Sequence, residues 1–271
     1  MRLLSQVHQV IKRISKRLPN FVRTPSIVQL YGKYNSKILW DEELIEDITQ
    51  FFDLSNAEAI RSLKSGRRDF IMLWNKINPR NERQILHFYE NAPYDVFSLA
   101  CWHMSRRQRK FRKKVITLCS GKVLDYGGGI GDLCVKLAEK GLETTYGDVK
   151  GKNMEFAQWL FKKENLNIKV VDLIREQILE QYDTIIYIDT IEHIPHPETA
   201  LTTIAKHLKK SGKLIITNLN CPGPTNESPM HFKINFNAEK LLNSHGIVKT
   251  KYDWLWIKDR NQAKPTTKEE T

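Results

Sequence analysis

An aspartate followed by closely spaced glycines is the stretch whose residue types best suggest ligand chemistry. Residues 122–132 read KVLDYGGGIGD, and apolar residues continue at helical spacing after them. Glycine lacks a Cβ, so it permits positive φ and lets a ligand approach the backbone. A helix beginning there turns unpaired N–H groups and its positive dipole end toward that ligand. The pattern predicts a strand, turn and helix around a nucleotide-like ligand, with a purely structural turn as the alternative.

The glycine spacing narrows the choice of ligand. A dinucleotide fingerprint counted from Gly127 would place its third glycine at Asp132, and no Gly-Lys-Ser/Thr of a phosphate loop follows. An acid two residues before G-x-G-x-G resembles motif I of the class I S-adenosylmethionine-dependent methyltransferases. That resemblance implies S-adenosylmethionine as cofactor, whose methionine end is cationic, and Asp125 would favour that end directly or through water. The glycines assigned to this site are Gly127, Gly128, Gly129 and Gly131.

Two more acids are expected at the ends of the next strands. Asp148 ends a predicted strand over 143–148, where the methyltransferase resemblance implies hydrogen bonds to the ribose hydroxyls, with Val149 beside it. A third strand over 168–171 is followed by Asp172 and Leu173. By the same resemblance, Asp172 would meet the adenine amino group and Leu173 the ring.

Residues 182–197, YDTIIYIDTIEHIPHP, form the second informative stretch. They resemble a motif of small-molecule methyltransferases, including those of ubiquinone and menaquinone synthesis. The resemblance implies that Asp189 lies beside the methionine moiety and that Glu192 and His193 lie at the mouth of the site. The Asn-Pro-Pro-aromatic tetrapeptide of amino-group methyltransferases acting on nucleic acids and proteins is absent, which disfavours a nucleic-acid substrate.

A general base is required only if the acceptor must lose a proton. We predict His193 and His231 as candidates, with Glu192 beside them and His196 third, because imidazole titrates near neutrality. The alternative is that a histidine after the fourth strand only holds a turn. Glu192, His193 and His196 could also gather a metal ion, but three ligands within five residues of a turn are weak support for one. No metal is predicted.

The elements that must position these residues alternate between strand and helix from residue 122 onward. This alternation predicts an α/β fold with a mainly parallel sheet and helices on both faces. The resemblance covers 120–258 and implies a Rossmann-like, doubly wound, seven-stranded sheet. The further elements expected are a helix over 153–163, a helix over 198–210, a turn at 211–212 before a strand over 213–217, a helix after Asn237 that stops at 245–246, and closing strands over 247–252 and 254–257.

The region before the sheet is expected to be helical, and the resemblance does not extend to it. Asp41 and the Ser55–Glu58 capping box predict two helix starts. Gly66 and Pro79 are expected to interrupt the helices, and Pro93 is expected to begin another helix. Its many aromatic residues suit a small helical core or a lid over an aromatic or lipid-like acceptor. The predicted organisation is a basic amphipathic helix at 1–20, a helical region at 21–119, the methyltransferase domain at 120–258 and a polar tail at 259–271.

The net charge of +12 is concentrated in two stretches, residues 1–40 and 106–114. Residues 1–18 form an acid-free amphipathic pattern, which suits docking on its own domain, an anionic membrane surface or an organelle-targeting segment. The 106–114 cluster suits a solvated face or a phosphate footprint for nucleic acid or anionic lipid.

The sequence therefore predicts a methyltransferase for a small molecule, with oxygen the acceptor atom by analogy and a lipophilic acceptor as one option. The alternatives are an RNA methyltransferase using residues 106–114 and a catalytically inactive binding or assembly protein. Four scattered cysteines predict free thiols in a reducing compartment. No apolar run reaches the roughly 18 to 20 residues of a membrane span. We expect a cytoplasmic protein, with peripheral membrane attachment as one possibility; no oligomeric state is predicted.

Overall fold

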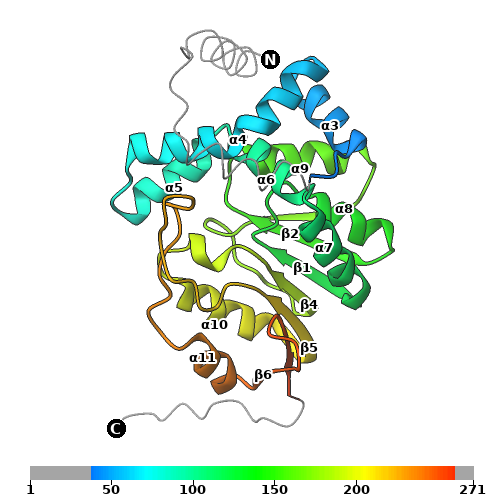
Figure 1. Cartoon of the computed structure of the whole chain (residues 1–271). Helices are drawn as coiled ribbons and strands as arrows, with labels where there is room; N and C mark the ends of the chain where they lie inside the picture. Colours follow the sequence, from blue (N-terminus) through cyan, green and yellow to red (C-terminus); the bar gives the residue numbers. More distant parts are fainter. Residues whose placement is uncertain (1–37, 260–271) are drawn as a thin grey trace.

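The computed structural model describes residues 38–259, in which a helical region precedes a sheet domain (Figure 1). The predictions for the 1–20 helix and for 260–271 lie outside the described residues. Asp41 caps the first described helix by accepting from Leu44 N at 3.3 Å, and Ser55 and Glu58 form the predicted capping box. The helices of this region are α3 (Glu42–Phe52), α4 (Asn56–Ile77), α5 (Glu82–Asn91), α6 (Asp95–His103) and α7 (Arg106–Leu118).

The prediction that Gly66 interrupts the helices was wrong, because Gly66 lies inside the continuous helix α4. A Cβ at Gly66 would come within 2.7 Å of Phe97 Cβ and 2.8 Å of Ser98 N. The glycine therefore permits a close crossing of α4 and α6, and the gain in helix–helix contact outweighs its poor helix propensity.

The sheet has seven strands in the order β3-β2-β1-β4-β5-β7-β6. Strands β1 to β5 pair in parallel, and β7 pairs antiparallel with both β5 and β6. The predicted Rossmann-like, doubly wound sheet is therefore confirmed. The strands are β1 (Lys122–Tyr126), β2 (Glu143–Asp148), β3 (Lys169–Asp172), β4 (Tyr182–Tyr187), β5 (Leu208–Ile216), β6 (Ile247–Lys249) and β7 (Leu255–Lys258).

Helices connect the strands on both faces of the sheet. They are α8 (Asp132–Glu139), α9 (Lys152–Lys163), the short 3-10 helix η1 (Ile191–His193), α10 (Pro197–His207) and α11 (Ala238–Ser244). The prediction that a turn at 211–212 precedes the fifth strand was wrong, because β5 already begins at Leu208. Tyr182 pairs with Leu208 whereas Thr184 pairs with Lys213, so β5 carries a bulge there in which Ser211 adopts φ 60°.

Alternating side chains bury the two faces of the sheet against different helices. Leu124 and Ile185 pack with the α10 and α11 side, whereas their neighbours Val123 and Ile186 pack with α7 and α8. All four are fully buried, and burial of such a side chain contributes roughly 1.5 to 3 kcal/mol. This two-sided burial explains why the strands read as continuous apolar runs.

A third hydrophobic core joins the helical region to the sheet domain. It combines Leu63 of α4 and Phe97 of α6 with Tyr146 of β2 and Phe156 of α9. The predicted boundary between 21–119 and 120–258 stays a prediction, and this core runs across it. The four cysteines are free thiols, as predicted. Within residues 38–259, the helices are too short or too polar to cross a bilayer.

Candidate active site

The glycine turn follows β1 and leads into α8, as predicted. Gly127, Gly129 and Gly131 have φ of 81°, 55° and 75°, the left-handed region that side chains with a Cβ rarely adopt. A Cβ at Gly131 would lie 2.7 Å from Ala157 Cβ, so α9 can approach the turn only because this residue is glycine. Gly127 N and Gly128 N donate to Gly147 O, at 2.7 and 3.0 Å, which fixes the turn on β2.

Helix α6 lies across this turn, which the sequence did not predict. Leu99 Cδ1 would be 3.1 Å from a Cβ on Gly129. His103 Nδ1 lies 3.1 Å from Asp132 Oδ1 at the start of α8. One face of α6 therefore covers the turn on which the cofactor is expected to lie.

Asp125 and Asp148 converge on the turn from β1 and β2. Asp125 is buried, and its Oδ2 accepts from the thiol of Cys134 at 3.4 Å. Asp148 Oδ2 accepts from Gly129 N at 2.6 Å and its Oδ1 from Val149 N at 2.7 Å. Burial raises the pKa of Asp125 to about 6 and that of Asp148 to about 7. Both carboxyl groups would be stabilised in the ionised form by a nearby cation or additional hydrogen-bond donors.

Asp172 is already engaged by protein groups. Its Oδ2 accepts from Arg175 Nη1 at 2.8 Å, and its Oδ1 accepts from Ile174 N at 3.1 Å. Arg175 also pairs with Glu90 of α5, and Leu173 N donates to Asp148 O at 2.9 Å. Asp172 and Leu173 are thus placed beside Asp148, while their predicted adenine contacts stay predictions.

Asp189 joins the sheet to the helical region. It adopts φ 50° just after β4. Its Oδ2 accepts from Trp102 Nε1 at 3.1 Å and from Gln108 Nε2 at 3.0 Å. Its Oδ1 accepts from Thr217 Oγ1 at 3.0 Å and Asn218 Nδ2 at 3.1 Å. Four donors therefore hold this carboxylate at the edge of the crevice.

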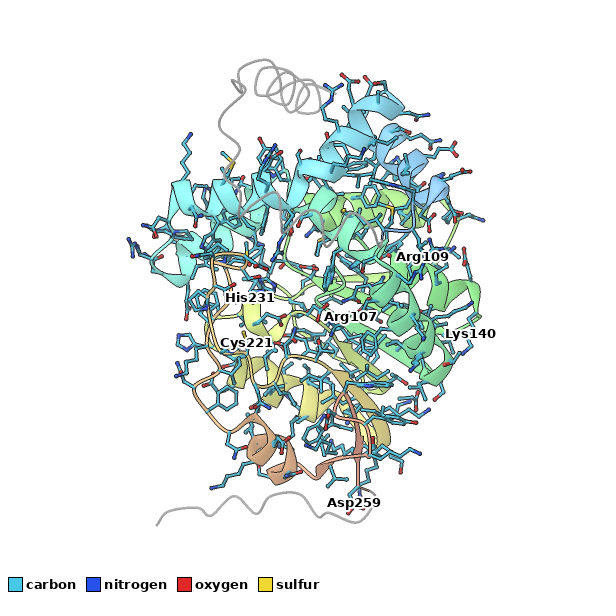
Figure 2. All side chains as sticks on the ribbon, in the orientation of Figure 1. Arg107, Arg109, Lys140, Cys221, His231 and Asp259 are labelled. Carbon is cyan, nitrogen blue, oxygen red and sulfur yellow. The ribbon has the colours of Figure 1, made fainter. Side chains whose placement is uncertain are left out.

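Glu192 and His231 line a cleft of about 490 Å³ beyond the end of β5. Phe232 N donates to Glu192 O at 2.7 Å, which brings the loop of His231 to the end of β4. Figure 2 shows His231 and Cys221 on this loop, and Cys221 Sγ lies 4.0 Å from His231 Nδ1. The remaining lining residues are Ile216, Thr217, Asn218, Leu219, Asn220, Pro222, Glu239, Lys249, Asp253 and Trp254.

The Glu192 carboxyl group is only half satisfied. Asn218 Nδ2 donates to its Oε1, while its buried Oε2 has no protein partner among the described residues. Burial, followed by the nearby charge of Asp189, raises the pKa of Glu192 to about 8. At pH 7 this group is therefore mostly protonated in the free protein.

The two candidate bases His193 and His231 lie against each other, with ring centroids 4.8 Å apart and planes at 88°. Donor atoms of Glu192 and both histidines lie within 4.8 Å of one another. His196 does not join them, which contradicts its place as third candidate base and ligand. It is exposed and pairs with Glu82 at 2.7 Å, because the chain turns outward into α10.

The residues present fit the S-adenosylmethionine implied by the sequence. The turn keeps a Cβ-free backbone surface, and Asp125, Asp148 and Asp189 gather around it from three neighbouring strand ends. Buried acids with raised pKa values favour a cationic ligand, which lowers the free energy of their ionised forms. Asp125 and Asp148 would favour the cationic cofactor, and Asp148 could accept hydrogen bonds from hydroxyl groups.

This fold and this arrangement of glycines and acids define a class I S-adenosylmethionine-dependent methyltransferase. Residues 103–261 match the sequence model of a family described as "Methyltransferase domain", and the chain belongs to that family. The matched segment begins at the end of α6, so α7 lies within it together with the sheet.

Curated relatives and solved structures are similar over part of the chain. The ubiquinone biosynthesis O-methyltransferase of Rickettsia akari is 31% identical over 101 residues, covering 36% of this chain and 40% of that protein. The protein of the same name from Rickettsia canadensis is 28% identical over 142 residues, covering 51% and 60%. The PH0226 protein from Pyrococcus horikoshii has a TM-score of 0.46 at 20% identity, covering 60% and 95%. The chain therefore spans 40% and 60% of the length of these two curated relatives, less than two thirds of each.

The 106–114 cluster mostly forms an exposed face of α7. Arg112 is the exception, because its Nη2 lies 2.6 Å from Asp132 Oδ1. Figure 2 shows Arg107 and Arg109 on this helix. The exposed cations are Arg106, Arg107, Arg109, Lys110, Lys113 and Lys114.

Proposed function

We propose that this chain transfers the methyl group of S-adenosylmethionine to an oxygen atom of a small-molecule acceptor. The observation that carries the proposal is the cleft lined by both Glu192 and His231, whose lining residue Asn218 donates to Asp189. The names of the curated relatives, which are O-methyltransferases, also support an oxygen acceptor.

The lining of the cleft suits an acceptor with an apolar body and a polar end. Ile216, Leu219 and Trp254 offer apolar surface, while Asn218 and Asn220 offer amide donors and acceptors. Such a mixture binds an apolar ring or chain and orients a hydroxyl group. A lipophilic acceptor fits this lining.

The protein's own groups would act chiefly by alignment and proton transfer. When bound, S-adenosylmethionine would supply an electrophilic methyl carbon, to which an acceptor oxygen bonds in line as the carbon–sulfur bond breaks and S-adenosylhomocysteine leaves. Holding two partners in line provides effective molarities of about 10⁵ to 10⁸ M. Burial and the charge of Arg67 lower the pKa of His231, so its imidazole is neutral at pH 7 and can accept the hydroxyl proton.

The test is transfer of a labelled methyl group to a panel of phenols and aliphatic alcohols, combined with calorimetric binding of S-adenosylmethionine. We expect His231→Gln to lower transfer at least about a hundredfold, the lower end of the 10² to 10⁴ range attributed to general bases, and to leave cofactor affinity unchanged. His196→Gln, at an exposed histidine outside the cleft, is the matched control. Full activity of His231→Gln would refute its role as base, and no cofactor binding by folded wild-type protein would refute the proposal as a whole.

Three further predictions from the sequence remain proposals: an RNA acceptor, attachment to an anionic membrane and organelle targeting. An RNA acceptor is supported by the exposed cations of α7. Attachment to an anionic membrane and organelle targeting both rest on residues 1–18. These residues lie outside the described part of the chain. Co-sedimentation with anionic vesicles, with and without residues 1–20, tests the membrane role, and unchanged binding of the shortened chain would refute it.

A further inference from the structure

Tyr89 brings the helical region into contact with the candidate catalytic residues. It lies on α5, and its hydroxyl oxygen is 2.8 Å from Nδ1 of His193. The two rings meet edge to face, with centroids 6.0 Å apart. His193 in turn lies against His231, whose ring lines the cleft. A row of three rings therefore runs from α5 to the acceptor site.

Packing holds this row in place from both sides. Phe70 and Phe88 of the helical region pack with Met230, the neighbour of His231. Arg67 Nη2 donates to Glu227 O at 2.8 Å and to Ser228 Oγ at 2.7 Å, which ties the same loop to α4. The geometry between Tyr89, His193 and His231 thus depends on the helical region as much as on the sheet.

The contact also indicates which nitrogen of His193 carries the proton. Among the described residues, the Tyr89 hydroxyl forms its hydrogen bond with Nδ1 of His193. If Nδ1 donated to Tyr89, the hydrogen of this half-buried phenol would lack a protein acceptor among the described residues, which is the less favourable arrangement. If Tyr89 donates, the Nδ1 lone pair is used and the proton of the neutral ring resides on Nε2.

We propose that Tyr89 is a positioning residue that donates its hydroxyl hydrogen to His193 Nδ1 and keeps His193 neutral as the Nε2–H tautomer. A neutral His193 places no second positive charge 4.8 Å from His231 when His231 accepts a proton from the substrate. His193 is then not the general base, and His231 takes that role alone. The role of His231 in this proposal rests on the proposed methyl transfer, whereas the tautomer of His193 does not.

Other groups around His193 agree with a neutral ring. The charged and titratable groups that face it are Arg67 of α4, Tyr89 of α5, Glu192 of the same turn and His231 of the loop. Burial, His231 and Arg67 together lower the pKa of His193 to about 3. Glu192 is mostly protonated at pH 7 and offers little negative charge to oppose this effect.

The experiment is long-range ¹H–¹⁵N NMR of the full chain with ¹⁵N-labelled histidine, which reads the tautomer of each ring without methyl transfer. The chain has eight histidines, and the His193 signals are those lost in His193→Gln. We expect lone-pair character at Nδ1 and a proton at Nε2 of His193 in the wild type. In Tyr89→Phe we expect a mixture of tautomers, while Tyr94→Phe, a tyrosine of the same region outside this contact, should leave the signals unchanged.

Kinetics then test whether the tautomer matters for transfer. Tyr89→Phe should lower kcat about fivefold to tenfold, the effect of one lost hydrogen bond, with KM for the cofactor unchanged. The same substitution should have no further effect in the His193→Gln background. A proton on Nδ1 in the wild type, or identical His193 spectra in Tyr89→Phe, would overturn the proposal even if the enzyme is active. An inactive wild type with the expected tautomer would overturn the proposed function alone.

Discussion

Binding of S-adenosylmethionine should release protons from this protein near neutral pH. Three carboxyl groups at the site have raised pKa values: Asp125 at about 6, Asp148 at about 7 and Glu192 at about 8. A cation bound near such a group favours its ionised form and lowers its pKa. Protons that the free protein holds at pH 7 must then leave as the cationic cofactor binds.

The size of the release follows from these values. At pH 7, a group with a pKa of 8 is about nine tenths protonated, one with a pKa of 7 about half, and one with a pKa of 6 about one tenth. Complete ionisation on binding would therefore release about 1.5 protons, mostly from Glu192 and Asp148. At pH 9.5 all three groups are already ionised in the free protein, so the release should approach zero.

Calorimetric titration in buffers of different ionisation enthalpy measures this release as the slope of binding enthalpy against buffer enthalpy. With complete ionisation on binding we expect a slope of about 1.5 protons at pH 7 and near zero at pH 9.5. Glu192→Gln should remove more than half of the release, whereas Glu198→Gln, at an exposed glutamate of α10, should leave it unchanged. Saturable binding with no release at pH 7, or with proton uptake, would refute the expectation that the bound cation ionises these buried acids.

Two further predictions concern the glycine turn and the basic helix. Gly129→Ala should weaken cofactor binding about tenfold, because the new Cβ on the cofactor turn would have positive φ and would lie 3.1 Å from Leu99 of α6. Gly141→Ala is the control: it also has positive φ but lies in open space, so it should lower the melting temperature and leave cofactor affinity unchanged. Replacing Lys110 and Lys113 with glutamate should leave methylation of small molecules within twofold of wild type, as measured by initial rates, and a large loss of salt-dependent RNA binding together with activity would instead favour the RNA acceptor.

Much of the fold could be predicted because its signals are local. The β2 bounds agree with the predicted 143–148, and the capping box at Ser55 forms as expected. The β5 boundary was missed because a bulge leaves no apolar periodicity. Residues 198–210 were predicted as a helix and 211–212 as a turn, yet β5 already begins at Leu208 and continues through these residues. Gly66 was misread because a glycine that ends a helix and one that permits a helix crossing look alike in sequence.

The candidate site was predictable only where its residues follow strand ends. Asp148, Asp189 and Glu192 could be placed from strand patterns and from the family resemblance. Gln108 was missed because it is the one uncharged polar residue within a run of cations, and that run indicated a solvated face. A signal was present in Ser105, which caps α7 through Gln108 N and so sets the helical phase that turns Gln108 inward.

The sequence by itself determined the strand, turn and helix around Gly127 and the alternation of strands and helices that implies a parallel sheet, because each depends on backbone preferences and side-chain alternation within about ten residues. The class of cofactor followed from the resemblance of residues 122–132 to a methyltransferase motif. The tertiary structure alone decided that Trp102 reaches Asp189, that Tyr89 holds His193 and that His196 turns away. The first two pairs lie 87 and 104 residues apart. Contacts at such separations arise from the packing of whole helices on the sheet, which no local pattern encodes.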